Sequence, residues 1–367
     1  MNRSPAISGN STRPTVWVMA GGTGGHILPG LAVAEVLRTQ GYDVRWLGNP
    51  ERMEGRLVTP AGFPMIAVRF AGVRGKGLLQ KLKAPFLLVS AVVRLLIEVM
   101  KRRPAVVLGM GGYVSMPGGL AAWLARVPLV LHEQNAIAGM SNQWLAKIAT
   151  RALTGFPQTL KGGVWTGNPV RQSMLGVEPP QMRYDNRKGP LRILIVGGSL
   201  GAAALNEVVP EAVGRIPEAL RPVILHQSGQ AHLQQLSENY ERHGVKAQCV
   251  AFIDDMAIEM AQADLLICRA GAMTVAEVAA VGLAALFVPF PFAVDDHQTA
   301  NANYLVRNDA AFLKQQSELA IDWLAQWLMV QQREYLAQIA VRAREFAKTD
   351  AAAEIARHCV ASMRSQA

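Results

Sequence analysis

The sequence predicts an α/β protein with two doubly wound domains, each a parallel sheet with helices on both faces. Short apolar segments alternate with amphipathic helical segments along all 367 residues, a pattern typical of parallel sheets with crossover helices. The chain is longer than one hydrophobic core usually supports, and 50% of its residues are apolar, which is enough for two cores. Glycine-rich turns also recur at matched places in the two halves.

Five apolar segments in each half are predicted to be strands. In the first half they are residues 16–20, 44–47, 65–70, 106–110 and 129–131. In the second half they are residues 193–196, 223–226, 247–252, 265–268 and 285–288. Each set is expected to build a Rossmann-like domain, and such domains bind ligands at the C-terminal ends of their strands. We therefore expect the two domains to share one ligand-binding cleft.

The net charge of +10 is unevenly distributed. Gly167-Asn168-Pro169 is predicted to be a linker. Residues 1–168 carry a net charge of +13, and residues 169–367 carry a net charge of −3. We predict a flexible tail at 1–14, a first domain at 15–168 and a second domain at 169–367. The basic first domain is expected to meet an anionic partner: nucleic acid, an acidic membrane surface or a phosphorylated substrate.

Neither a disulfide framework nor a metal site is predicted. The three cysteines are widely spaced and lie in apolar or helical stretches, which favours reduced, buried thiols in a cytoplasmic protein. Asp295, Asp296 and His297 are adjacent, but no further metal ligand follows at a fixed spacing. We expect no obligatory cofactor.

Four glycine-rich or small-residue turns follow predicted strands, at residues 21–26 (GGTGGH), 111–115 (GGYVS), 197–202 (GGSLGA) and 270–274 (AGAMT). Such a turn lets backbone N–H groups approach a phosphate, and the following helix adds about half a positive charge. One such turn can serve packing alone, whereas four at matched positions favour two phosphorylated ligands. Neither the dinucleotide fingerprint nor the P-loop motif matches, which disfavours NAD-dependent and kinase-like chemistry.

Two polar groups in the first half are candidates for chemistry. His26 opens the helix after the first turn, and a side chain with a pKa of about 6.5 suits a general base; the alternative is a helix cap. The segment HEQN (132–135) follows the apolar strand at 128–131. Its carboxylate and amides are predicted to bind sugar hydroxyls, or else to hold the loop in place.

Two segments of the second half are predicted to bind a nucleotide sugar. In RAGAMTVAE (269–277), N–H groups would face a diphosphate and Glu277 would bind a ribose diol, unless Glu277 only complements the helix dipole. In PFPFAVDDHQTAN (289–301), Gln298 is predicted to bind sugar hydroxyls. The alternative for this segment is that Asp296 caps the following helix.

The segment 69–103 combines nine basic residues and many apolar residues with one acid, Glu98. Its longest uncharged run, 84–93, is far shorter than the roughly twenty residues of a spanning helix. We expect it to lie on an anionic membrane surface, with 78–88 as the exposed part. The alternative is that 85–100 is an ordinary crossover helix with a solvated basic rim.

Eight motifs in order resemble one known family, the undecaprenyldiphospho-muramoylpentapeptide β-N-acetylglucosaminyltransferases, or MurG family. They are GGTGGH, GMGGYVSMPGG, HEQN, GNPVR, GGSLGA, FIDDM, CRAGAMTVAE and DDHQ. The resemblance extends from Val16 to the last helices and implies conversion of lipid I to lipid II. One mild departure is Leu200, where relatives also have a polar residue such as Gln.

The resemblance implies a GT-B fold, with an N-terminal acceptor and membrane-associating domain and a C-terminal UDP-GlcNAc-binding domain, the last helix packing back on the first. It implies His26 or Glu133 as base, and an acceptor diphosphate near Gly111, Gly112 and Tyr113. It implies donor contacts from Thr23, Gly24, Gly25, Asn135, Arg171, Ser199, Ile253, Ala272, Met273, Thr274, Val275, Ala276, Glu277 and Gln298.

The resemblance also implies a place and partners. The protein would be peripheral on the cytoplasmic face of the bacterial inner membrane, with partners in the cell-wall and division machinery. Two rivals remain: a UDP-sugar epimerase or diacylglycerol glycosyltransferase of the same fold, and a basic nucleic-acid-binding protein. HEQN and GGYVS disfavour the first. The interleaved Leu and Val of the basic segment disfavour the second, so we expect no nucleic acid as partner.

Overall fold

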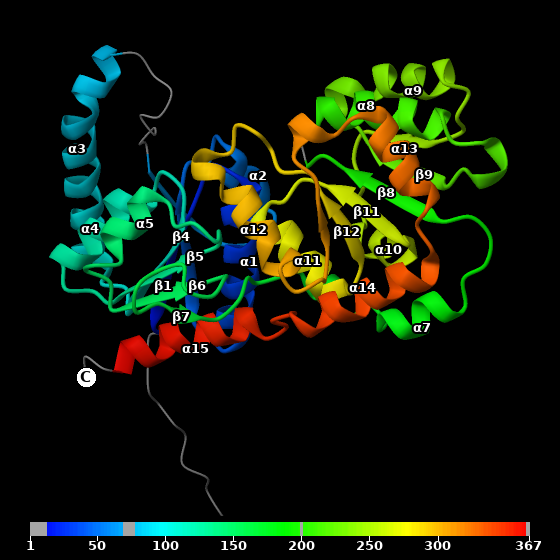
Figure 1. The fold of residues 1–367 in the computed structure, drawn as a ribbon. Coiled ribbons are helices and arrows are strands. Elements are labelled where there is room, and N and C mark those ends of the chain that lie inside the picture. Colours follow the sequence, from blue (N-terminus) through cyan, green and yellow to red (C-terminus); the bar gives the residue numbers. More distant parts are fainter. Residues whose placement is uncertain (1–12, 69–77, 199–200, 365–367) are drawn as a thin grey trace, which may run out of the picture. The chain divides into compact units, whose positions relative to one another are not determined.

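A computed structural model describes residues 13–68, 78–198 and 201–364 (Figure 1). Contacts between Cα atoms divide the chain into two compact units. Unit 1 comprises Met1–His132, Met140–Ala152 and Ala353–Ala367, and unit 2 comprises Glu133–Gly139 and Leu153–Ala352. This division places most of HEQN in unit 2 and the C-terminal helix in unit 1. Nearly all of the predicted tail at 1–14 lies outside the described residues, as do Ser199 and Leu200.

The first sheet has the strand order β3-β2-β1-β4-β5-β6-β7, and its defined registers are parallel. Its strands are β1 Thr15–Ala20, β2 Asp43–Gly48, β3 Met65–Ala67, β4 Val106–Gly111, β5 Leu129–Glu133, β6 Arg151–Thr154 and β7 Val164–Trp165. The helices of this part are α1 Gly24–Thr39, α2 Met53–Val58, α3 Leu78–Arg102, α4 Ser115–Leu124, α5 Met140–Leu145 and α15 Ala351–Arg364. One sheet face packs its apolar side chains, among them Trp17 and Met19, against α3 and α4.

The second sheet has the order β10-β9-β8-β11-β12-β13, and all of its pairs are parallel. Its strands are β8 Arg192–Val196, β9 Val223–Gln227, β10 Gln248–Val250, β11 Leu265–Cys268, β12 Ala284–Phe287 and β13 Phe312–Leu313. Its helices are α6 Gln172–Leu175, α7 Pro180–Asp185, α8 Ala203–Gly214, α9 Leu233–Arg242, α10 Met256–Gln262, α11 Ala272–Val281, α12 His297–Val306, α13 Ile321–Met329 and α14 Arg333–Glu345.

Alternate residues of the second sheet enter two separate cores. Ile193 and Ile195 of β8 face α8, α9 and α13, whereas Leu194 of the same strand faces α10 and α11 on the other side (Figure 1). Burial on both faces explains why the central strands β11 and β12 are apolar without interruption. It also leaves the strand ends, with their turns, as the part of the sheet available to ligands.

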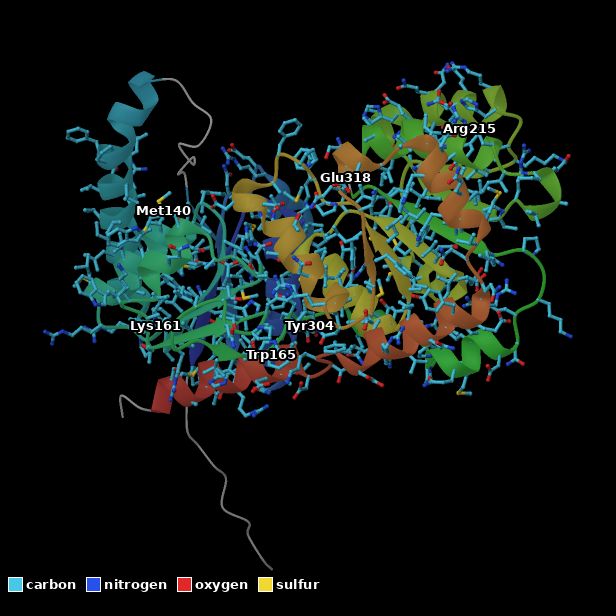
Figure 2. The ribbon with its side chains drawn as sticks, viewed as in Figure 1. Met140, Lys161, Trp165, Arg215, Tyr304 and Glu318 are labelled. Carbon is cyan, nitrogen blue, oxygen red and sulfur yellow. The ribbon has the colours of Figure 1, made fainter. Side chains whose placement is uncertain are left out.

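Aromatic side chains from α12, β7 and the end of α14 pack together. The Tyr304 ring lies edge-on to Trp165, with ring centroids 6.3 Å apart (Figure 2). The Tyr304 hydroxyl donates to the backbone oxygen of Phe346 at 2.9 Å. Gly167 has φ +80°, and a Cβ there would lie 2.3 Å from Cβ of Lys348. The Gly167-Asn168-Pro169 segment is therefore tightly packed, in contrast to the open linker that the sequence suggested.

The predicted fold class is confirmed, with two parallel-sheet domains of doubly wound type. All ten predicted strands overlap observed strands, although β3 ends at Ala67 and β10 at Val250. The strands β6, β7 and β13, of two to four residues, were missed. The prediction that HEQN follows its strand is wrong by two residues, because His132 and Glu133 are the last residues of β5.

Candidate active site

The turn GGTGGH connects β1 to α1, which begins at Gly24, two residues before His26. Thr23 is the N-cap residue, and its backbone oxygen accepts from the N–H groups of His26 and Ile27. The first N–H groups of a helix lack an intrahelical acceptor, and the first turn of α1 contains no acidic residue. Thr23, Gly24 and Gly25 therefore present the positive end of α1 at an exposed turn.

The turn GGYVS packs directly on the first turn. Gly111 has φ +103°, and a Cβ there would lie 2.6 Å from Nδ1 of His26. Gly112 has φ +85°, and a Cβ there would lie 2.0 Å from the backbone oxygen of Gly21. Only glycine fits at either position. The structure therefore brings His26 together with Gly111 and Gly112.

A residue that the sequence analysis missed lies beneath both turns. The Glu54 side chain is completely buried, and its Oε1 accepts from the N–H of Gly22 at 3.2 Å. Burial and the nearby Glu54 carboxylate raise the pKa of the Tyr113 hydroxyl well above its usual range. The sequence ERMEG (51–55) contains no pattern that predicts this contact. Glu54 meets the two turns only when the segments that follow β1, β2 and β4 come together in the fold.

Glu133, one of the two base candidates, holds its own loop. Its side chain is 3% exposed. Its Oε1 accepts from the backbone and side-chain amides of Asn135 at 2.9 and 3.2 Å, and its Oε2 accepts from the N–H of Gly139 at 3.1 Å. These contacts match the loop-holding alternative for HEQN.

Two amides of α12 surround the backbone at the start of the AGAMT turn. Oε1 of Gln298 accepts from the N–H groups of Ala270 and Phe290 at 3.2 and 2.9 Å. Because both partners are donors, the carbonyl of the Gln298 side chain faces the backbone and its NH2 group is left for a ligand. The completely buried Asn301 donates to the backbone oxygen of Ala270 at 3.1 Å.

Asn301 also connects to the HEQN loop. Its Oδ1 accepts from the N–H of Ala136 at 2.7 Å, and its Nδ2 contacts Oδ1 of Asn135 at 3.3 Å. Asn135 and Gln298 are thus tied through Asn301 to the same backbone, within unit 2. The sequence analysis missed Asn301, although it ends the polar segment in which Gln298 was identified.

Helix α11 presents its N-terminus after the AGAMT turn. Gly271 is the N-cap residue and makes no side-chain cap, and the first turn contains no acid. Ala272 and Val275 are buried. The other predicted positions of this turn, Met273, Thr274 and Ala276, are partly exposed. The backbone amides of this turn are therefore placed to face a diphosphate.

Arg171 and Glu277 are brought together. Nε and Nη2 of Arg171 both donate to Oε1 of Glu277, at 3.1 and 2.9 Å. This geometry leaves Oε2 of Glu277 for a further donor such as a ribose hydroxyl. Burial raises the pKa of Glu277, and the Arg171 cation opposes that shift. Glu277 lies in the second turn of α11, beyond the first turn, in which the helix dipole acts most strongly.

The other predicted positions have more limited support. Ile253 follows β10 and is 7% exposed. Ser199 lies outside the described residues. Asp296 does not cap α12 through its side chain; its carboxylate instead accepts from the Thr299 hydroxyl at 2.7 Å. Within the described ranges, no group of three or more His, Cys, Asp or Glu could hold a metal ion.

Sequence comparisons identify both halves of the chain. Residues 16–154 match the glycosyltransferase family 28 N-terminal domain, and residues 192–356 match the C-terminal domain of that family. A UDP-N-acetylglucosamine–N-acetylmuramyl-(pentapeptide) pyrophosphoryl-undecaprenol N-acetylglucosamine transferase from Bordetella pertussis is 58% identical over 346 residues, which is 94% of this chain and 97% of that protein.

Structural comparisons agree. A crystal structure of MurG from Acinetobacter baumannii has a TM-score of 0.84 and 40% identity, covering 95% of this chain and 99% of that one. A putative UDP-N-acetylglucosamine 2-epimerase from Listeria monocytogenes has a TM-score of 0.67 at 13% identity, covering 97% of this chain and 98% of that one, which shows a shared fold alone. The chain belongs to glycosyltransferase family 28 and, within it, to the MurG family.

Proposed function

We propose that this protein transfers N-acetylglucosamine from UDP-GlcNAc to the 4-hydroxyl of the muramoyl-pentapeptide of lipid I, giving lipid II with inversion at the anomeric carbon. The observation that carries this proposal is the 58% identity, over nearly the whole chain, to a transferase named for this reaction. The two sets of turns support it, because each offers a site for a phosphorylated substrate.

Unit 2 binds the donor in this proposal. The N-terminus of α11 receives the diphosphate, and Oε2 of Glu277 accepts from the ribose diol. The NH2 group of Gln298 and the amide of Asn135 contact the sugar, the backbone of Ile253 contacts the uracil, and Arg171 and Ser199 flank the diphosphate. Charge that develops on the departing UDP is stabilised by fixed amides and a helix dipole. For this reason we propose that no metal is obligatory.

Unit 1 handles the acceptor. The amides at Gly112 and Tyr113 and the adjacent Gly111 face the acceptor diphosphate, while Thr23 to Gly25 face the donor. His26 takes the proton of the 4-hydroxyl as its oxygen bonds to the anomeric carbon and the bond from that carbon to UDP breaks. His26 is favoured over Glu133 because the Glu133 carboxylate already accepts three loop N–H bonds.

Unit 1 also attaches to the membrane in this proposal. On α3, Phe86 is 80% and Val89 is 61% exposed, and neighbouring α5 exposes Met140 by 70% (Figure 2). Further exposed apolar residues are Leu87, Val93, Ile97, Met100, Trp123, Leu124 and Trp144. Of the predicted segment 78–88, side chains are described only from Pro85, and the exposed apolar surface continues past it to Met100. No helix in the described part of the chain is long and apolar enough to cross a membrane.

The transfer is tested with radiolabelled UDP-GlcNAc and a lipid I analogue, followed by determination of the new glycosidic linkage. A β-1,4 product supports the proposal. Hydrolysis or epimerisation of UDP-GlcNAc without transfer would overturn it and favour the epimerase alternative.

Membrane attachment is tested by co-flotation with vesicles of anionic phospholipid. We expect Val89→Glu to reduce co-flotation severalfold, because it places a charge on the exposed apolar surface of α3. Val223→Glu, at a comparably exposed valine of unit 2, is the matched control. Equal co-flotation of both variants, or binding to DNA stronger than to vesicles, would contradict this part of the proposal.

A further inference from the structure

Two neighbouring glutamines, Gln315 and Gln316, lie beside the loop that carries Gln298. They follow β13, which pairs with the last two residues of β12. The N–H of Lys314 extends this pairing by donating to the backbone oxygen of Phe287 at 2.9 Å. The chain leaves β12 directly after Phe287 and enters the loop 288–299. Both glutamines are therefore placed next to the start of this loop, and both are only partly exposed.

Gln316 supports the start of the loop through Arg269. Its Oε1 accepts from Nη2 of Arg269 at 2.7 Å, although the two residues are 47 positions apart. Nη1 of Arg269 donates to the backbone oxygens of Val288 and Pro289, both at 3.1 Å. The guanidinium also lies over the Phe290 ring, 5.5 Å from its centroid. One arginine, oriented by Gln316, therefore holds three consecutive residues of the loop.

Gln315 supports the end of the loop. Its Nε2 donates to the Thr299 hydroxyl at 3.1 Å, and that hydroxyl donates its proton to Oδ1 of Asp296 at 2.7 Å. Asp295 and Asp296 have φ +53° and +49°, a left-handed conformation that is unfavourable for residues other than glycine. Such a backbone persists only where its surroundings hold it in place. The bonds from Gln315 and Thr299 supply that restraint.

Gln298 lies between the two supports. Its Oε1 accepts from the N–H of Phe290 at 2.9 Å, and it directly precedes Thr299 in the sequence. Two turns connect the supports, because the N–H of Ala293 donates to the backbone oxygen of Phe290 at 3.0 Å and the N–H of Asp296 donates to that of Ala293 at 3.1 Å. The direction of the Gln298 amide therefore depends on both ends of the loop.

We propose that Gln315 and Gln316 are positioning residues for the donor sugar, which hold the loop 288–299 at its two ends and so orient the Gln298 amide. This inference rests on the proposed function. The two glutamines use opposite chemistry, because Gln316 accepts through its side-chain oxygen whereas Gln315 donates through its NH2 group. A carboxylate can replace the first but not the second.

Replacement by glutamate separates the two roles in the full-length protein. Gln316→Glu keeps an acceptor for Arg269, so its affinity for UDP-GlcNAc should equal that of the wild type. Gln315→Glu loses the donor to Thr299, so its affinity should fall about fivefold, as for the loss of one hydrogen bond. Gln316→Leu removes the acceptor of a charged donor and should lower the affinity about tenfold. Calorimetric titration with UDP-GlcNAc measures these affinities.

Titration with UDP separates positioning from general destabilisation. UDP has no sugar for Gln298 to bind, so its affinity should stay unchanged in all three variants. Gln235→Glu, at an exposed glutamine of unit 2, should behave as the wild type. If Gln315→Glu or Gln316→Leu does not fold, methionine replaces the glutamine at that position.

Three results would overturn the proposal: unchanged affinity for UDP-GlcNAc in Gln315→Glu or Gln316→Leu, an equal loss of affinity for UDP, or the same effect of glutamate at both positions. Absence of UDP-GlcNAc binding by the wild type would instead overturn the proposed function, and this inference with it.

Discussion

The two units support similar glycine turns with different chemistry. In unit 1 a buried carboxylate, Glu54, accepts from the N–H of Gly22. In unit 2 two neutral amides, Gln298 and Asn301, hold the N–H and the C=O of Ala270. The proposed reaction explains the difference, because UDP leaves with added negative charge, and neutral amides do not oppose that charge. Matching sequence motifs therefore do not imply matching support beneath them.

The largest expected effect concerns the histidine that only unit 1 places at its turns. Replacing it, as His26→Ala, should lower kcat at least about a hundredfold, the low end for a general base. Gly111→Ala should also lower kcat, because its Cβ would lie 2.6 Å from Nδ1 of His26. His232→Ala in unit 2 is the control. Full activity of His26→Ala would remove His26 as the base and leave the transfer reaction itself unaffected.

The amide hydrogen bonds that hold the AGAMT turn of unit 2 are tested at Asn301. Asn301→Ala leaves the Ala136 N–H and the Ala270 C=O without their partner, so the free energy of unfolding should fall by about 2 kcal/mol. Asn308→Ala removes an exposed amide at the end of the same helix, with one bond to Tyr304, and should have little effect. Denaturant unfolding of both variants measures the difference. Equal stabilities would show that the amide network does not hold the turn.

The carboxylate of unit 2 is expected to contact substrate, unlike that of unit 1. Glu277→Gln should raise the KM for UDP-GlcNAc about tenfold, because it weakens both the Arg171 pair and an acceptor for the ribose. The KM for the lipid I analogue should not change. Glu207→Gln, an exposed acid of the same unit, is the matched control. A rise confined to the acceptor KM would reverse the assignment of the two units.

The smallest expected effect comes from a buried histidine of unit 2. Burial lowers the pKa of His226 to about 3, so the unfolded chain binds a proton below about pH 6.5 that the folded chain does not. Stability is therefore unaffected at high pH and falls with acidification, by about 0.7 kcal/mol between pH 7 and pH 6. Unfolding of wild type and His226→Gln across this range tests the effect. The variant should lose less stability.

The features that the sequence could predict were local. Short, mainly apolar segments identified all ten predicted strands, and the turns after them located His26, Gly111 and the start of α11. The supporting contacts could not be predicted, because Glu54 is 32 residues from Gly22 and Asn301 is 165 residues from Ala136. Glu133 shows the same limit. Its residue type suits a base, but its bonds to Asn135 and Gly139 appear only once the loop is folded.

The most direct test of the division between the units is calorimetric titration with UDP-GlcNAc, without acceptor, of wild type, Glu54→Gln and Glu277→Gln. The account predicts affinity weakened about tenfold for Glu277→Gln and a smaller loss for Glu54→Gln, which acts on the donor only through the turn at Thr23 to Gly25. Weakened binding by Glu54→Gln together with unchanged binding by Glu277→Gln would contradict it.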